Sequence, residues 1–426
     1  MAEQFNNSIN ADAGHIFVVA QYYYPEQFRT NDVCAEWVRR GYRVTVLTGI
    51  PNYPAGKFFD GYSLFKNRRE VHDGVEIIRV PVIPRGKNRI MLTLNYFSFM
   101  FFAALWCMFT NIKPDLVFSF ETSPIFQVIP AVRFAKKRNI PCYVYALDLW
   151  PESFQIMTGI KNALMVKLVC AAVDYVYKRS TRIFVPSRAY IDPVADRNVE
   201  REKIVYWPQY AEDILPARMK QPSEKIPDDG SFNIIFAGNL GFAQGLDALP
   251  KAAAELAALK PKRRVVFNIV GDGRYRDRLL EEIDKCGVGY MFRFHGRCRA
   301  DEVPAYLAAC DAAYLGYMPN ALFEKAVPAK LQTYMACAMP IIACAEGESA
   351  RIINESACGM TCACSDYKAL ARIIAGFAQL GEDELGCMSS NSLGYCRENF
   401  SKKELMDAMD EHFGLKPLKQ EANANV

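Results

Sequence analysis

Apolar residues follow two alternating periods along the chain. Short β-branched and aromatic runs at residues 15–21, 42–49 and 74–82 are typical of buried strands, and stretches with helical periodicity lie between such runs. Strand, helix and strand at this spacing form a right-handed parallel unit. The alternation starts again at residue 232 and continues with short strands each followed by a helix. The pattern therefore predicts an α/β protein with two doubly wound parallel sheets.

A polar, proline-bearing segment without periodicity separates the two halves. We predict a Rossmann-like N-terminal domain at 14–210, a linker at 211–231, a Rossmann-like C-terminal domain at 232–385 and a helical tail at 386–415. The length of 426 residues fits two domains of about 200 residues each.

Residues Ile90–Phe109 carry no charge and are long enough to span a bilayer. A span would put successive strands of one sheet on opposite sides of a membrane, which argues against it. Two interpretations stay open: a helix buried against the sheet, and a monotopic helix whose exposed face dips into lipid.

Composition makes several classes of partner and cofactor poor candidates but does not identify a function. The net charge of +4 comes with no basic tail, so nucleic acid is a poor candidate partner. The N-terminus lacks the pattern of a secretory signal, and we expect a cytoplasmic protein. The fourteen cysteines are mostly within apolar segments. Cys358, Cys362 and Cys364 come closest to a zinc cluster, but no CxxC pair or nearby histidine completes it, so no metal is predicted.

Candidate chemistry lies where strands break into glycine-bearing turns. Residues 232–246, FNIIFAGNLGFAQGL, predict a strand, a tight turn and the start of a helix. GDG at 271–273 and HGR at 295–297 follow similar strands. These turns should open on the same edge of one sheet, where backbone N–H groups can bind an anion. We interpret this edge as a nucleotide site.

Six motifs in the right order give the chain a family resemblance. They are AGNLGFAQGLDAL, NIVGDG, FHGR, VPAKLQTYMACAMPIIA, PNYPAGKFFDGY and ALDLWPES, and the resemblance that they carry extends from about His15 to Phe400. Together they resemble the retaining family 4 glycosyltransferases of the GT-B fold, and within them the bacterial branch that builds O-antigen, capsule or colanic-acid polysaccharide, including fucosamine transferases.

The resemblance implies two Rossmann-like domains with an interdomain cleft and a helical tail that returns to the N-terminal domain. It implies transfer of a sugar, with retention, from a nucleotide diphosphate sugar to a glycan acceptor carried on a polyprenyl diphosphate. The donor, for which a UDP-sugar is favoured, would bind the C-terminal domain without a metal, and the acceptor would bind the N-terminal domain. The expected location is the cytoplasm, with peripheral contact to the inner face of the membrane.

The donor residues depart from the family pattern. The family's arginine and lysine in the first turn are replaced by Asn239 and Gln244, which leaves two amides and the backbone of Gly238 and Gly241. A turn selected only for tight packing is the alternative. Lys330, at a helix start, then becomes the main candidate cation for the diphosphate.

Other donor candidates lie in neighbouring turns. Arg297 is a second candidate cation, and Asp272 with Gly273 either touches the donor or simply forms a turn. The family's two glutamates fall on Lys325 and Thr333, with Glu324 adjacent to the first. Thr333 can still bond a ribose hydroxyl.

On the N-terminal side, Asp148 and Glu152 follow a strand and are the candidate catalytic pair, although Asp148 also suits a helix N-cap. No nucleophile is assigned, because the donor phosphate is thought to take the acceptor proton in retaining GT-B enzymes. Four loop residues are candidates for the acceptor side, with loop packing as the alternative: Glu26, Arg29, Asn52 and Tyr53.

Two other functions remain open. A GT-B-like nucleotide-sugar epimerase would share the fold but need no second sugar. A non-catalytic nucleotide-sugar-binding partner in polysaccharide assembly would explain the missing charged residues. Products formed from donor alone, or no turnover with any acceptor, would separate these functions from a glycosyltransferase.

Overall fold

The computed structural model describes residues 13–86, 88–122, 124–159, 162–211 and 224–415. These residues form two compact units. The first runs to Pro186 and includes Tyr190–Tyr206 and the chain from Ala408 on, and the second contains Ser187–Ala189 and Trp207–Asp407. Most of the predicted linker, residues 212–223, lies outside the described residues.

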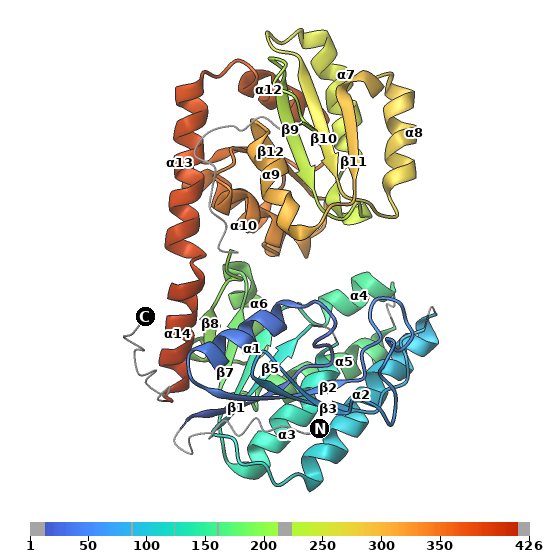
Figure 1. Ribbon diagram of the computed structural model, residues 1–426, viewed down its shortest axis with the longest axis vertical. Coiled ribbons are helices and arrows are strands. Elements are labelled where there is room, and N and C mark those ends of the chain that lie inside the picture. Colours follow the sequence, from blue (N-terminus) through green and yellow to red (C-terminus); the bar gives the residue numbers. More distant parts are fainter. Residues whose placement is uncertain (1–12, 87, 123, 160–161, 212–223, 416–426) are drawn as a thin grey trace, which may run out of the picture. The chain divides into compact units, whose positions relative to one another are not determined.

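The first unit is built on an eight-stranded sheet (Figure 1). Its strands are β1 (His15–Val19), β2 (Arg43–Gly49), β3 (Arg69–His72), β4 (Val75–Val80), β5 (Leu116–Glu121), β6 (Cys142–Ala146), β7 (Arg182–Val185) and β8 (Ile204–Tyr206). They lie in the order β3-β4-β2-β1-β5-β6-β7-β8. Neighbouring strands of this order pair in parallel except β3 with β4, which pair antiparallel. The sequence pattern did not predict β3.

Helices connect the parallel strands of this unit. They are α1 (Arg29–Arg39), α2 (Arg89–Phe109), α3 (Ile129–Arg138), α4 (Glu152–Thr158), α5 (Ala163–Tyr177) and α6 (Ile191–Ala195). Helix α1 buries Val33, Cys34 and Trp37 on one face and is followed by Gly41 at φ 92°. This left-handed residue ends the helix and turns the chain into β2.

Helix α2 is more exposed than a core helix. It links β4 to β5, which belong to the same sheet. Among the described helices, α2 is the one that is long and apolar enough to cross a membrane. Only 28% of its most apolar window is buried. Phe99 and Ala103 face the protein, whereas Phe101 and Phe109 are 60% and 73% exposed. The fully buried interpretation of this segment is therefore wrong.

The second unit is a six-stranded, fully parallel sheet. Its strands are β9 (Phe232–Ala237), β10 (Val265–Val270), β11 (Phe292–Gly296), β12 (Ala312–Gly316), β13 (Ile341–Cys344) and β14 (Gly359–Cys362). Their order is β11-β10-β9-β12-β13-β14, the doubly wound arrangement of a Rossmann fold. Its helices are α7 (Ala248–Leu259), α8 (Arg276–Cys286), α9 (Val303–Ala308), α10 (Ala329–Ala336), α11 (Gly347–Ser356), α12 (Tyr367–Phe377) and α13 (Glu382–Asn399). The predicted boundary at residue 385 falls inside α13.

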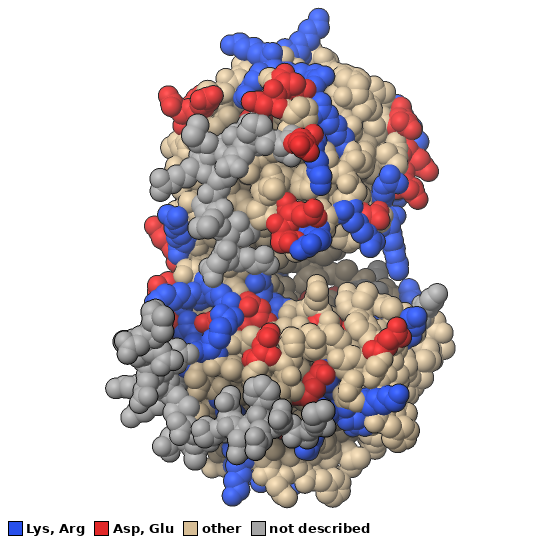
Figure 2. All heavy atoms as spheres, viewed as in Figure 1, with Lys and Arg blue, Asp and Glu red and all other residues tan. Residues whose placement is uncertain are grey.

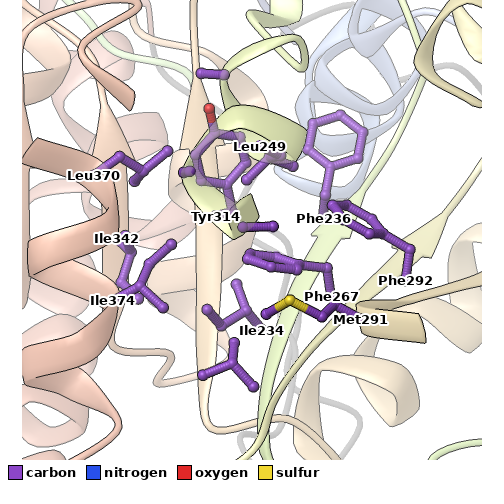
Figure 3. Close-up of a cluster of buried hydrophobic side chains, with 14 of the residues drawn as sticks. Ile234, Phe236, Leu249, Phe267, Met291, Phe292, Tyr314, Ile342, Leu370 and Ile374 are labelled. Carbon is purple, nitrogen blue, oxygen red and sulfur yellow. The ribbon is translucent and has the colours of Figure 1, made fainter. Parts of the chain in front are cut away.

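Both faces of the second sheet are covered. On one face, side chains such as Ile234 and Phe267 pack against Leu249 of α7 and Ile374 of α12 (Figure 3). On the other face, residues such as Ile235 pack in a second cluster that includes α10 and α11 side chains. Burial on both faces explains why these strands read as continuous apolar runs in the sequence.

The last helix, α14 (Lys402–Phe413), is divided between the two units. Near its start, the Leu405 carbonyl accepts a hydrogen bond from Nε1 of Trp207 at 2.7 Å, within the second unit. Near its end, Phe413 stacks on Tyr143 with ring centroids 5.6 Å apart, and Asp410 pairs with Arg40, both within the first unit. The chain therefore completes its first unit with its last helical residues.

Candidate active site

The carboxyl edge of the second sheet contains a topological switch point. From β9 the chain proceeds to β10 and β11 on one side and later returns to β12, β13 and β14 on the other. Ligands of open α/β sheets bind beyond the carboxyl ends of the strands at such a point. The turn after β9, which holds Gly238, Asn239, Gly241 and Gln244, lies at this edge.

Three turns at this edge pack backbone against backbone. A Cβ on Gly271 would lie 1.9 Å from the Gly238 carbonyl oxygen, and a Cβ on Gly273 would lie 2.2 Å from the Leu240 oxygen. The Leu240 amide donates to the Asp272 carbonyl at 3.0 Å, and the Gly271 amide donates to the Gly296 carbonyl at 2.7 Å. Glycine is required here because any side chain would separate the turns.

Lys330 reaches from the first turn of α10 to the turn after β9. A Cβ on Gly238 would lie 3.0 Å from Lys330 Cε. Lys330 Nζ donates a hydrogen bond to Gln244 Oε1 and lies 4.1 Å from the centre of the Phe236 ring. Burial lowers the pKa of the Lys330 ammonium to about 7. A half-buried cation held at a helix N-terminus, where the helix dipole opposes it, is suited to meeting an anion. The alternative of a solvated surface lysine does not fit these contacts.

The first turn itself is electrically neutral. The side chain of Asn239 lies between the neighbouring glycines, since a Cβ on Gly241 would be 3.0 Å from its Nδ2 and a Cβ on Gly273 would be 2.7 Å from its Oδ1. Gln244 ends a short 3-10 turn at Phe242–Gln244, and its Oε1 accepts a hydrogen bond from Lys330 Nζ. The lysine therefore meets an uncharged amide oxygen of this turn.

Asp272 and Arg297 are brought together at the same edge. Arg297 Nε contacts Asp272 Oδ2 at 3.2 Å, and Asp272 Oδ1 accepts from the Gly273 amide at 2.8 Å. The Arg297 side chain is 80% exposed, so this ion pair contributes little to stability. Its guanidinium remains accessible to a ligand.

Thr333 and Glu324 lie in and before α10. The Thr333 hydroxyl donates to the Ala329 carbonyl at 3.0 Å, so its oxygen remains an acceptor for a ligand hydroxyl. The Glu324 carbonyl is covered by Gly347, where a Cβ would lie 2.0 Å away. Its half-buried carboxylate makes no hydrogen bond to other described residues.

The carboxyl edge of the first sheet gathers acidic groups. Its switch point lies between β1 and β5, and the last residue of β5, Glu121, is in register with Ala146 at the end of β6. Asp148 follows in the next loop and Glu152 begins α4. The N-cap of α4 is Pro151, so Asp148 is not a helix cap. Asp148, Glu121 and Glu152 all raise the pKa of Tyr190, although burial is the largest cause.

Glu121 is the residue of this edge that sequence reasoning missed. It is 0% exposed, and neither carboxyl oxygen has a hydrogen-bond partner among the described residues. Burial, with a smaller contribution from Asp148, raises its pKa well above the usual range. The visible signal was an acidic residue ending the buried run LVFSFE.

Glu26 and Asn52 brace two loops at this edge. Glu26 is 2% exposed, and its Oε1 accepts from the amides of Asn52 and Tyr53 at 2.7 and 2.6 Å. Burial raises the Glu26 pKa to about 7 despite these bonds. Asn52 Oδ1 accepts from the Arg85 amide at 2.9 Å. These two side chains hold the loop and do not themselves reach the surface.

Tyr53 and Arg29 are the accessible members of the predicted acceptor set. The Arg85 guanidinium lies 5.1 Å from the centre of the Tyr53 ring, which is 36% exposed. Arg29 is the first residue of α1, and its charge acts on Tyr145 at the end of β6. Arg85 had no sequence signal, because only the fold brings it to Tyr53.

Metal ligands are not grouped in the described residues, where no set of three His, Cys, Asp or Glu side chains could hold an ion. Basic and acidic side chains are interspersed on the face shown in Figure 2.

Comparisons with known proteins agree over most of the chain. Residues 27–209 match the family described as Glycosyl transferase 4-like domain, and residues 218–386 match Glycosyl transferases group 1. The glycosyltransferase WbjE of Pseudomonas aeruginosa is 27% identical over 68% of this chain and 72% of its own length. WcaI of Escherichia coli K12, named as a colanic acid biosynthesis glycosyl transferase, is 23% identical over 71% and 75%. The structure of Anabaena HepE in complex with UDP superposes with a TM-score of 0.66 at 14% identity, covering 94% of this chain and 99% of HepE.

Proposed function

Because the chain belongs to the GT-B glycosyltransferases, with a 4-like domain before a group 1 domain, we propose that it builds a bacterial surface polysaccharide. In this proposal it transfers a sugar, with retention, from a nucleotide diphosphate sugar to a glycan carried on a polyprenyl diphosphate. The observation that carries the donor assignment is Lys330, a half-buried cation directed at a neutral glycine turn on the switch-point edge.

The donor diphosphate would replace Gln244 as the hydrogen-bond partner of Lys330. A phosphate oxygen is a stronger partner for an ammonium than an amide oxygen, so donor binding would exchange Gln244 Oε1 for phosphate at Lys330. The N–H groups of Gly238 and Gly241 already donate to the Val270 and Asn239 carbonyls, so the side-chain amides of the turn would be its neutral donors. The Thr333 hydroxyl oxygen would accept a hydrogen bond from a ribose hydroxyl, and Arg297 would lie beside the base. The UDP in the HepE complex favours a UDP-sugar.

The sugar-transfer step needs charge stabilisation more than a protein nucleophile. As the glycosidic bond breaks, negative charge grows on the leaving diphosphate, and Lys330 would already be in place to hold it. The acceptor hydroxyl would attack the same face of the sugar, and the donor phosphate would take its proton. Asp148 and Glu152 would orient the acceptor hydroxyls, and no metal is required.

The same proposal includes peripheral contact with the inner face of the membrane. A lipid-linked acceptor has to be met at a bilayer surface, and α2 offers an exposed apolar face there. Side chains at helical spacing are exposed along it: Ile90, Leu94, Phe97, Phe101, Leu105 and Met108. Such a helix lies in the membrane interface without spanning it.

Calorimetric titration with UDP- and GDP-sugars tests the donor site. We expect Lys330→Ala to lose donor binding while keeping the wild-type circular dichroism spectrum. Lys368→Ala, which removes an exposed lysine of α12, is the matched control and should bind normally. Wild-type affinity in Lys330→Ala would refute the diphosphate role.

Product analysis tests the reaction class. A glycosyltransferase needs an acceptor, so donor alone should give at most slow hydrolysis. An epimerised nucleotide sugar from donor alone would identify an epimerase instead. Donor binding without turnover on any lipid-linked glycan would identify a binding partner.

A further inference from the structure

A groove of about 640 Å³ runs between the second half of α2 and the β3–β4 edge of the first sheet. Its walls are apolar and are formed mainly by Val80, Pro81, Phe102, Leu105 and Phe109. Two arginines, Arg68 and Arg69, also line it, and no acidic residue does. An apolar trough with a cationic border differs from the polar donor edge of the second unit.

The two arginines differ in their contacts. Arg68 is fixed, because its Nε donates to the Arg79 carbonyl at 2.5 Å and its Nη1 donates to the Leu64 carbonyl at 3.0 Å. Arg69 is exposed and makes no ion pair with another described residue. The nearest acid along the strand, Glu70, is already paired with Arg79 at 2.5 Å. The groove therefore presents positive charge that the described part of the unit does not neutralise.

The groove is continuous with the exposed face of α2, since Leu105 belongs to both. An occupant that satisfies the whole site must place an anion beside the arginines and hydrocarbon along the helix. Free phosphate would leave the apolar walls in water. We propose that this groove binds an anionic phospholipid of the bilayer, with the phosphate at Arg68 and Arg69 and the acyl chains along α2.

This lipid is an anchor and not the reacting acceptor. In the strand order, β3 and β4 lie at the outer edge of the sheet, and β2 and β1 separate them from the switch point beside β5. An acceptor has to reach the switch point, whereas an anchor does not. The proposal rests on the proposed membrane contact and adds the chemical class of lipid that is recognised.

Vesicle co-sedimentation with the full chain tests the proposal. Wild-type protein should bind vesicles of phosphatidylcholine with phosphatidylglycerol more tightly than vesicles of phosphatidylcholine alone. An arginine near an anionic surface is worth roughly fivefold in binding. Arg69→Gln should therefore reduce binding to the anionic vesicles by about fivefold and leave binding to the neutral vesicles unchanged.

Two further variants separate a groove from a general charge effect. Lys262→Gln combined with Lys368→Gln removes two exposed charges of the second unit and should leave vesicle binding as in the wild type. Arg68→Gln combined with Arg69→Gln should remove the preference for anionic lipid altogether. Arg69→Gln alone is the decisive variant, because Arg68 also holds the Leu64 loop.

The outcomes distinguish the groove from the function it rests on. An unchanged anionic preference in Arg69→Gln would overturn the groove while leaving membrane contact intact. Binding that requires polyprenyl phosphate in the vesicles, or saturation of Arg69 by inorganic phosphate with unchanged vesicle binding, would overturn the phospholipid as occupant. Failure of the wild type to bind any vesicle would remove the membrane contact and the groove together, with sugar transfer to a soluble acceptor still measurable.

Discussion

In both sheets the chain leaves the central strand in one direction and returns on the other side, yet the side chains at the two carboxyl edges differ in kind. The edge of the second unit has neutral turns with Lys330 and Arg297. The edge of the first unit has Glu121, Asp148 and Glu152. A diphosphate suits the first arrangement, and acceptor hydroxyls, which donate hydrogen bonds, suit the second.

The two edges also differ in what holds them. Backbone contacts between glycine turns form the second-unit edge, and a Cβ at Gly271 would overlap a carbonyl. The first-unit edge contains two buried carboxyl groups, Glu26 and Glu121, and Glu26 accepts hydrogen bonds from two backbone amides. In both units the shared topology determines where a ligand can bind, and the side chains at the strand ends determine the chemistry. Substitutions should therefore affect the two edges in different ways.

The largest effect is expected for Gly271→Ala. Its Cβ would lie 1.9 Å from the Gly238 oxygen at φ 129°, so the turns have to separate. We expect a loss of roughly 4 kcal/mol in the free energy of unfolding of the second unit, with loss of donor binding. Urea titration measures it. Gly287→Ala, at φ 67° with no atom within 4 Å, is the control and should cost about 1 kcal/mol.

The next largest effect is a change in the pH dependence of stability when Glu26 is replaced. Its folded pKa, about 7, is above the ordinary 4.5, so the folded state binds the extra proton and stability falls as pH rises from 4.5 to 7. Glu26→Gln keeps the acceptor oxygen and removes this loss. It should be more stable than wild type by up to about 3 kcal/mol above pH 7 and no different below pH 4.5.

Thermal unfolding across pH measures that difference. Glu398→Gln, on the exposed face of α13, should show the wild-type pH profile. A Glu26→Gln profile that parallels the wild type would show that the first-unit edge is not held by a protonated carboxyl group.

Asp148→Asn tests the division of roles between the edges. If Asp148 orients the acceptor, kcat should fall about a hundredfold while donor affinity stays constant. Steady-state kinetics combined with donor calorimetry separate the two quantities. Weakened donor binding together with unchanged kcat would reverse the assignment of this edge.

The smallest effect is the pH dependence of donor binding. Because the free Lys330 has a pKa of about 7 and phosphate binds its charged form, donor affinity should fall with rising pH, by about tenfold between pH 8 and pH 9. Lys330→Arg stays charged and should flatten this profile. A wild-type affinity independent of pH would exclude Lys330 as the titrating cation.

Sequence periodicity predicted the α/β class and the alternation of strands and helices because parallel strands are buried on both faces. It did not predict β3, although Asp73 and Gly74 carry the turn signal. Both have positive φ, 49° and 76°, and an Asp-Gly pair between two strands is typical of a hairpin. The short, half-exposed strand lacks the apolar run that marked the others.

Side-chain environment was less predictable than strand order. The motif VPAKL pointed to Lys330, but the ring of Phe236 beneath it depends on the tertiary fold. Asn52 and Glu26 were predicted as loop residues facing a ligand, and the structure buries them as partners of each other. Sequence spacing places a residue at a strand end, whereas packing decides whether its side chain points outward or supports the loop.

The divided helix α14 has a consequence for how the chain is made. Trp37 and Tyr143 are translated early, but Phe413, which packs against both with ring centroids 5.5 and 5.6 Å away, is translated only after the entire second unit. The nascent first unit therefore leaves the ribosome with an apolar surface uncovered. Its folding is completed only when the second unit has been synthesised, which ties the maturation of the first unit to that of the second.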